Sequence, residues 1–184
     1  MKSFNPVAIK PYVQMNLFTE YKDRPANRFI SVYRVSLVKD ATVSFGQVII
    51  NNAMKAQSVI QELIRTRGQP DREQFVVALL SAKNEMIGLN IVSIGGLSSA
   101  SVSPREVLKP AILANSAAMI LCHNHPSNIL DPSPDDIAIT RRIISAAEII
   151  GIQVHEHLII NMDDSRYYSF ADQGIIARMY SEIG

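Results

Sequence analysis

Two short apolar runs constrain the fold of this chain more than any other feature of its sequence. Residues 73–80 (EQFVVALL) and 117–122 (AAMILC) contain almost no polar side chains. Runs of this length and composition are typical of strands that are buried on both faces of a sheet, and residues 152–160 (IQVHEHLII) predict a further strand. Segments with helical signals lie between these runs. We therefore predict an α/β fold with a central mixed β-sheet flanked by helices.

Local signals predict the remaining elements. Residues 28–38 and 42–50 are rich in β-forming residues and predict a hairpin, and residues 85–96 predict the antiparallel partner of the first apolar run. Helix signals predict helices over 51–68, from Ser133 to about Gly151, and over 169–183 after a turn at 163–168. A further helix, from Ser103 to about Ser116, is predicted to begin with a capping box of Ser103 and Glu106 and to kink at Pro110.

The elements divide the chain into three predicted parts. Residues 1–28 are rich in proline, asparagine and charge without a clear period, and we expect an N-terminal arm there. Residues 29–68 form a lead-in of one β-hairpin and one helix. Residues 69–184 form the domain that carries the functional motifs described below.

Composition excludes several classes of protein. Hydrophobic residues make up 47% of the chain and charged residues 19%, which is ordinary for a globular domain. The net charge of +1 gives no overall sign of a nucleic-acid partner. Cys122 is the only cysteine, so no internal disulfide can form. Neither an apolar signal-peptide core nor a membrane-spanning run is present, and we expect a cytoplasmic protein without a membrane partner.

The segment 121–136 (LCHNHPSNILDPSPDD) has the pattern of a metal site. His123 and His125 lie two residues apart at the end of a predicted strand, so their side chains share one face. Pro126 ends the strand, and a short loop returns the chain to a helix start. Asp136, in the first turn of that helix, can point back toward the histidines. Two imidazoles, one carboxylate and a water form the ligand set of a catalytic zinc site, which lowers the pKa of the water to roughly 7.

Each part of this segment also has an ordinary structural explanation. A pair of histidines at a strand end is often no more than polar surface, and an aspartate such as Asp136 often only complements the helix dipole. Ser133, as an N-cap before Pro134, is a good helix start without any chemistry. It is the combination of these features, in this order and this close together, that favours a metal site.

The segment 123–136 resembles the His-X-His-Pro…Ser-X-X-Asp signature of the JAMM (JAB1/MPN) metalloproteases. The stretches 103–127 (SPREVLKPAILANSAAMILCHNHPS) and 151–160 (GIQVHEHLII) are similar to the RadC group of that superfamily, and the resemblance extends from about Glu73 to Gly174. It implies the three-layer, cytidine-deaminase-like architecture of JAB1/MPN domains, with a metal-dependent hydrolase domain over 69–184. RadC proteins often carry a helical domain upstream that nothing in this sequence resembles, so we expect the catalytic domain alone.

The resemblance also implies roles for individual residues. His123, His125 and Asp136 match the Zn²⁺ ligands of the family. Ser133 matches the serine that stabilises the oxyanion or positions the water, a role compatible with capping the helix. The spacing from Ser133 selects Asp136 over its neighbour Asp135, which points about 100° away around the helix.

The family further requires a glutamate that holds the attacking water and transfers its proton to the leaving amine. Glu73 precedes an apolar strand, as the family's glutamate does, and we prefer it as this base. Glu85 opens the partner strand and is the second candidate, although a solvated charge at a strand end explains it equally well.

Several positions depart from the family pattern. Asn128 occupies a position that is usually glycine, and asparagine tolerates the positive φ that such a turn needs. Glu156 replaces the usual aspartate before His157. His155 and His157 either form a second metal pair or divide between a position beside the first site and the surface. Cys122 lies on the strand face opposite the histidines, where we expect a small core residue.

Three functions follow from these features. We predict a zinc-dependent hydrolase that cleaves a peptide or isopeptide bond in an unknown protein or peptide substrate. The first alternative is a DNA-repair or DNA-processing protein of the RadC group, which should carry a basic stripe beside the metal. The second is a non-catalytic interaction module, and a homodimer is compatible with all three. The basic residues near the motif are Arg105, Lys109, Arg141 and Arg142.

Overall fold

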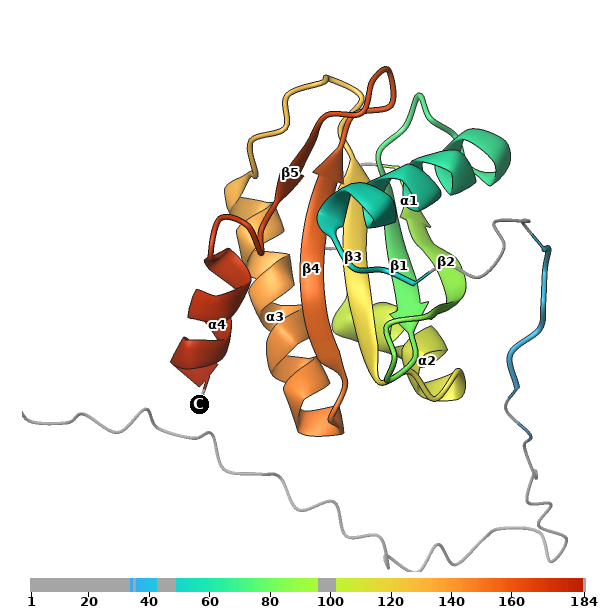
Figure 1. Ribbon diagram of the computed structural model, residues 1–184, viewed down its shortest axis with the longest axis vertical. Helices are drawn as coiled ribbons and strands as arrows, with labels where there is room; N and C mark the ends of the chain where they lie inside the picture. The colour runs from blue at the N-terminus through green and yellow to red at the C-terminus, as the bar shows by residue number, and fades with distance from the viewer. Residues whose placement is uncertain (1–33, 35, 43–48, 96–101, 184) are drawn as a thin grey trace, which may run out of the picture. The chain divides into compact units, whose positions relative to one another are not determined.

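The computed structural model describes residue 34 and residues 36–42, 49–95 and 102–183, which contain four helices and five strands (Figure 1). The strands are β1 (Gln74–Leu80), β2 (Met86–Ile94), β3 (Ala118–Asn124), β4 (Gln153–Ile160) and β5 (Tyr167–Ser169). The helices are α1 (Ala53–Arg67), α2 (Pro104–Leu113), α3 (Pro134–Ile150) and α4 (Ile175–Ile183).

The five strands form one mixed sheet in the order β2-β1-β3-β4-β5. Only β3 and β4 pair in parallel, and the other neighbours are antiparallel. Every residue of β1 and of β3 is buried, as expected for the apolar runs at 73–80 and 117–122. The predicted α/β class with a central mixed sheet flanked by helices is confirmed.

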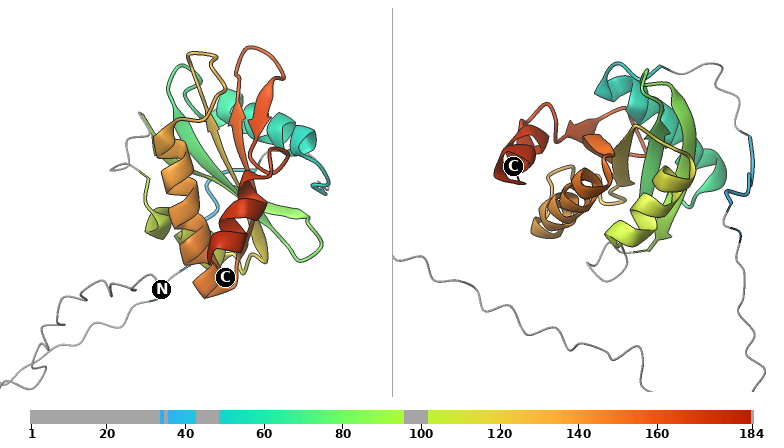
Figure 2. Two further views of the ribbon diagram at one scale, coloured as in Figure 1. Left: turned by 90° about the vertical axis from the view of Figure 1, so that its left-hand side faces the viewer. Right: turned by 90° about the horizontal axis from the view of Figure 1, so that it is seen from below.

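Helices cover both faces of the sheet, so that the unit has three layers (Figures 1 and 2). Strand side chains alternate between the two faces. In β1, Phe75 and Val77 join the core beneath α2, α3 and α4, whereas Val76 and Ala78 join the core beneath α1. The same alternation places Cys122 in the α1 core, where burial raises the pKa of its thiol well above the usual value.

Side-chain caps fix the ends of two predicted helices. The Asn52 side chain accepts a hydrogen bond from Lys55 N at 2.8 Å and begins α1. Ser133 and Asp136 form a capping box at the start of α3, which ends at Gly151 with φ of 79°. Both helices therefore lie where the sequence predicts them.

The start of α2 differs from the prediction. Ser103 precedes the helix, but its side chain makes no capping hydrogen bond, so the predicted capping box is wrong here. Glu106 instead forms an ion pair with Lys109 at 2.5 Å, one turn further along the helix. The helix continues through Pro110 to Leu113.

The C-terminal segment also differs from the prediction. Part of the predicted turn at 163–168 is strand, because Tyr167 begins β5, and the final helix begins at Ile175 and not at 169. The cause is the buried carboxylate of Glu156 in β4. It accepts hydrogen bonds from Ser169 Oγ at 2.5 Å and from Ala171 N at 2.9 Å, which hold this segment against the sheet.

The predicted arm (1–28) and most of the predicted hairpin (28–50) lie outside the described residues, so these parts stay predictions. Residues 36–42 contain no helix or strand, and Ile49 forms an isolated antiparallel bridge with Glu85. In the described part of the chain, no helix combines the length and the apolar character needed to cross a bilayer.

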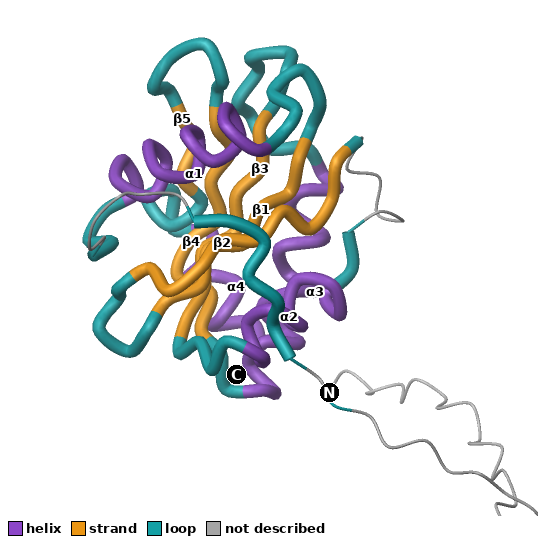
Figure 3. The backbone as a smooth tube through the Cα atoms, turned by 90° about the vertical axis from the view of Figure 1, so that its right-hand side faces the viewer, coloured by secondary structure: helices purple, strands orange, loops and turns teal. Residues whose placement is uncertain are grey.

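Three loops meet at one edge of the sheet (Figures 1 and 3). They comprise residues 68–73 before β1, residues 125–133 after β3 and residues 161–166 after β4. Because β3 and β4 are parallel and β1 is antiparallel to both, β1 begins at the edge where β3 and β4 end. This end of the sheet, where β1 begins and β3 and β4 end, carries the predicted metal site and is called the metal edge below.

Candidate metal centre

Strand pairing brings the predicted site residues together from distant parts of the sequence. Phe75 in β1 pairs with His123 in β3, so Glu73, just before β1, lies near the histidines at the end of β3. The first turn of α3 adds Asp136 at the same edge of the sheet.

The ligand atoms face one another at short range. His123 Nε2 lies 3.0 Å from His125 Nε2 and 3.3 Å from Asp136 Oδ1. Asp136 Oδ2 and Glu73 Oε1 lie 3.9 Å and 3.8 Å from His125 Nε2. The ligand atoms of Glu73, His123 and His125 all lie within 4.8 Å of one another, the arrangement expected of side chains that can hold a metal ion. The structure thus gathers both predicted histidines and both predicted carboxylates.

Burial is uneven across this cluster. The side chains of His123 and Asp136 are 0% and 3% exposed, whereas those of His125 and Glu73 are 15% and 25% exposed. The side of the site formed by His123 and Asp136 is therefore buried in the protein, whereas the side formed by His125 and Glu73 is open to solvent. Burial lowers the pKa of His123 to about 3, although the nearby Asp136 carboxylate opposes this shift. His123 is consequently neutral at pH 7, the form in which imidazole binds metals.

Hydrogen bonding prepares His125 for the same role. Its Nδ1 lies 2.5 Å from the carbonyl oxygen of Ile129, and a carbonyl can only accept, so Nδ1 carries the proton. In the neutral ring, Nε2 then presents its lone pair toward His123 and the two carboxylates. Two imidazole nitrogens and carboxylate oxygens are ligands that suit Zn²⁺, so the donor chemistry of the cluster fits the predicted ion.

The capping box orients Asp136. Ser133 donates to Asp136 Oδ2 through its backbone nitrogen at 2.7 Å and through its hydroxyl at 2.6 Å. Oδ1 is then the carboxylate oxygen nearest His123. The neighbouring Asp135 is exposed, so the structure supports the choice of Asp136 over Asp135. Within this arrangement Ser133 acts as the cap that positions Asp136, and its role toward a reacting group stays a prediction.

The two candidate glutamates lie at opposite ends of the sheet. Glu73 precedes β1 at the metal edge, whereas Glu85 follows the far end of β1, where its backbone bridges to Ile49. Seven strand residues separate these ends, which corresponds to about 20 Å at the usual rise per residue. Only Glu73 is therefore close to the histidines.

Asn124 holds the Glu73 segment in place, a role that the sequence analysis missed. Its side chain is fully buried on the α1 face of the sheet. It accepts from Gln74 N at 2.9 Å and donates to Arg72 O at 2.9 Å, the residues on either side of Glu73. The available signal was its place between the two histidines, since strand alternation must turn it to the opposite face.

The second pair of histidines does not form a metal pair. Val154 pairs with Met119 and Glu156 with Ile120, so a β-bulge leaves His155 as an extra residue in β4. His155 is exposed, whereas His157 is fully buried and its Nε2 lies 2.8 Å from His123 Nδ1. The prediction of a second metal pair is wrong, and its alternative is confirmed: one histidine lies beside the first site and the other at the surface.

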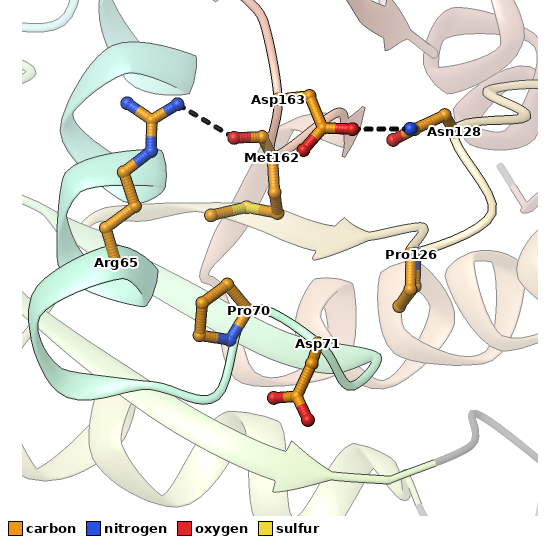
Figure 4. Close-up of a pocket in the computed structure, with 7 residues that line it drawn as sticks. All are labelled: Arg65, Pro70, Asp71, Pro126, Asn128, Met162 and Asp163. Atoms are coloured by element: carbon orange, nitrogen blue, oxygen red, sulfur yellow. Dashed lines mark hydrogen bonds between the residues drawn. The ribbon is translucent and has the colours of Figure 1, made fainter.

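A cavity of about 570 Å³ opens among the three loops at the same edge (Figure 4). Pro126 lines it directly after His125, and Asn128 and Asp163 close one side through a hydrogen bond of 2.6 Å. Asn128 has φ of 60°, the positive value predicted for this turn. The full lining consists of Arg65, Pro70, Asp71, Pro126, Asn128, Met162 and Asp163.

A three-layer α/β unit with two histidines and two carboxylates at one sheet edge defines a class of metal-site domain, and comparison with known proteins places it in a family. The chain belongs to the RadC-like JAB domain family, whose model matches residues 50–175. It is 43% identical over 128 residues to a UPF0758 protein of Desulfitobacterium hafniense (strain DSM 10664 / DCB-2), covering 70% of this chain and 54% of that protein. It is 47% identical over 106 residues to a UPF0758 protein of Rubrobacter xylanophilus, covering 58% and 45%. The chain spans about half the length of these curated relatives.

Proposed function

We propose that this chain is a zinc-dependent hydrolase of the JAMM type that cleaves a peptide or isopeptide bond. The observation that carries the proposal is the convergence of His123, His125 and Asp136 with Glu73 at one half-open edge of the sheet. Zinc bound there would supply a Lewis acid that lowers the pKa of water to roughly 7. Membership of the RadC-like JAB domain family and the presence of a candidate metal site do not depend on this proposal.

The residues of the chain divide the chemical work between them. His123, His125 and Asp136 are the proposed ligands, and their hydrogen bonds hold them in position before any ion arrives. Glu73 is the most exposed of the four side chains and lies on the side open to solvent. It would accept the proton of the attacking water and return it to the leaving amine. Ser133 would assist the tetrahedral intermediate from the adjacent helix start.

We propose the cavity among the three loops as the place for a part of the substrate chain away from the scissile bond, because neither the proposed ligands nor Glu73 line it. It begins at Pro126, next to His125, and three separate loops contribute to its walls. An open cavity of this kind suits a segment of polypeptide that extends from the metal edge. The occupant would be a segment of a protein or peptide substrate. A homodimer stays a prediction.

The DNA-processing alternative has weaker support. Of the four basic residues near the motif, Lys109 pairs with Glu106 and Arg141 pairs with Glu182. Two of the four charges are thus engaged within the protein, which leaves Arg105 and Arg142 of the predicted stripe. The cavity wall adds Arg65, whose guanidinium donates to Met162 O at 2.8 Å. The interaction-module alternative ranks last, because every expected ligand is present.

Metal analysis of the purified protein tests the proposal. We expect about one zinc per chain, and loss of the metal in a His123→Ala/His125→Ala variant. Cleavage of isopeptide-linked and DNA substrates by the same two proteins then separates the functions. Zinc retained by the variant would contradict the proposed ligands. Cleavage of DNA by the wild-type protein, lost in the variant, would mean that the protein is a nuclease and not a peptidase.

A further inference from the structure

A chain of buried hydrogen bonds connects α3 to His123 behind the metal site. Thr140 Oγ1 lies 2.5 Å from the backbone oxygen of Asp136 and 2.6 Å from His157 Nδ1. His157 Nε2 lies 2.8 Å from His123 Nδ1. The side chains of Thr140, His157 and His123 are all fully buried, so water does not enter this chain of bonds.

The position of each proton in this series of hydrogen bonds follows from which groups can donate and which can only accept. A carbonyl oxygen only accepts, so the single hydroxyl proton of Thr140 points to Asp136 O. Toward His157, the Thr140 oxygen must therefore accept, and His157 Nδ1 must carry the proton. The neutral ring of His157 then has a bare Nε2, which accepts the proton of His123 Nδ1.

We propose that Thr140 and His157 are positioning residues that fix His123 in the tautomer whose bare Nε2 faces Asp136 and His125. We call this series of hydrogen bonds the relay. The spacing of residues in the sequence does not reveal it, because its members come from α3, β4 and β3. Thr140 lies one turn after Asp136 on α3, so one helix supplies both a proposed ligand and the group that sets the tautomer of another.

The opposite tautomer is incompatible with the contact between Thr140 and His157. If His157 Nε2 carried the proton, a bare Nδ1 would face the Thr140 oxygen at 2.6 Å without a proton between them. His123 Nε2 would then carry a proton that points at the ligand position. Phe75 and Phe170 pack against the rings of His123 and His157, with ring centroids 6.1 Å and 4.7 Å apart. In the proposed tautomers the bare Nε2 atoms of His123 and His125 lie 3.0 Å apart without a proton between them, a contact that a bound cation would satisfy.

The consequence for metal binding rests on the proposed function, whereas the tautomer itself can be measured without metal. We expect ¹H–¹⁵N long-range spectra of ¹⁵N-histidine-labelled, metal-free protein to show His123 and His157 with protons on Nδ1. A proton on Nε2 of His123 would overturn the proposal. A wild-type protein that shows the expected tautomer but binds no zinc would refute the proposed function and leave the relay intact.

Two variants of Thr140 test the effect on the metal. Thr140→Val keeps the shape and removes the hydroxyl, whereas Thr140→Ser keeps the hydroxyl and is the matched control. Chelator competition should show zinc bound about tenfold more weakly by Thr140→Val than by Thr140→Ser, the lower end of the range for groups that support metal ligands. Thermal denaturation checks that both metal-free variants fold. Equal affinities of two folded variants would overturn the relay, and the wild-type spectrum decides the question if Thr140→Val fails to fold.

Discussion

Three short motifs together build a site at the metal edge, whereas the second copies of these motifs, at three separate places in the described part of the chain, do not build a second one. The metal edge has a His-X-His pair, a Ser-Pro-X-acid helix start and a glutamate before a strand. Elsewhere the chain repeats each of them, in β4, at the start of α2 and at the start of β2. The two sets of motifs have the same spacing in the sequence. They differ in the residues that surround them in the folded protein.

The histidine pairs show how a single residue of register decides the outcome. His123 is the penultimate residue of β3 and His125 directly follows the strand, and their Nε2 atoms lie 3.0 Å apart. The bulge in β4 separates His155 from His157, so that one is exposed and the other is fully buried. A bulge has no reliable sequence signal, and this is why the sequence could not decide between a second metal pair and two unrelated histidines.

Paired substitutions of these histidines should produce the largest contrast. We expect His123→Ala to reduce zinc from about one ion per chain to nearly none, because three-ligand sites depend on each ligand. His155→Ala should leave the zinc content unchanged, because His155 is exposed outside the site. Metal analysis of both purified variants makes the measurement, and circular dichroism checks their folding. Equal loss of zinc in the two variants would mean that the pairs are equivalent after all.

The two glutamates sharpen the comparison through activity. Glu73→Gln should keep zinc and lower the turnover of an isopeptide substrate by a factor of about 10² to 10⁴, the range for loss of a general base. Glu85→Gln, at the other end of β1, should change turnover by less than about twofold, as expected for a substitution far from the site. Steady-state kinetics of both proteins checks this. If only Glu85→Gln lost turnover, Glu85 and not Glu73 would be the general base, and the assignment would be wrong.

The sequence predicted the layers of the fold because apolar runs and helix caps are local signals. It predicted His123, His125 and Asp136 because the three lie within one segment, and the resemblance to the JAMM proteins added Glu73, which precedes an apolar strand as the family's glutamate does. It could not predict Asn124 as the support of Glu73, since the partners Arg72 and Gln74 lie about 50 residues away in the chain. Long-range hydrogen bonds of this kind depend on strand register, which spacing alone does not fix.

Asn124 gives a test of that long-range support. Asn124→Ala should lower the free energy of unfolding by about 2–3 kcal/mol, because Gln74 N and Arg72 O would lose their buried partner. Asn90→Ala is a matched control on the exposed side of β2 and should change the stability by less than about 0.5 kcal/mol. Urea denaturation measures both. If Asn124→Ala were as stable as the control, the segment around Glu73 would have to be held by other contacts.

The two serine caps should give the smallest contrast. Ser133→Ala should cost about 1 kcal/mol of unfolding free energy, because its hydroxyl accepts from Asp136 N at 3.2 Å and donates to Asp136 Oδ2 at 2.6 Å. Ser103→Ala should cost less than about 0.5 kcal/mol, since its side chain makes no capping hydrogen bond.

The reason for this contrast lies in the acid three residues later in each motif. Glu106 is drawn to Lys109, one turn further along α2, whereas Asp136 turns back to Ser133 and keeps its other oxygen toward His123. Ser133→Ala should therefore also weaken zinc binding, whereas Ser103→Ala should not. Urea denaturation and chelator competition on the two variants measure these effects. If both variants lost the same stability and bound zinc equally well, the cap at α3 would be independent of the metal edge.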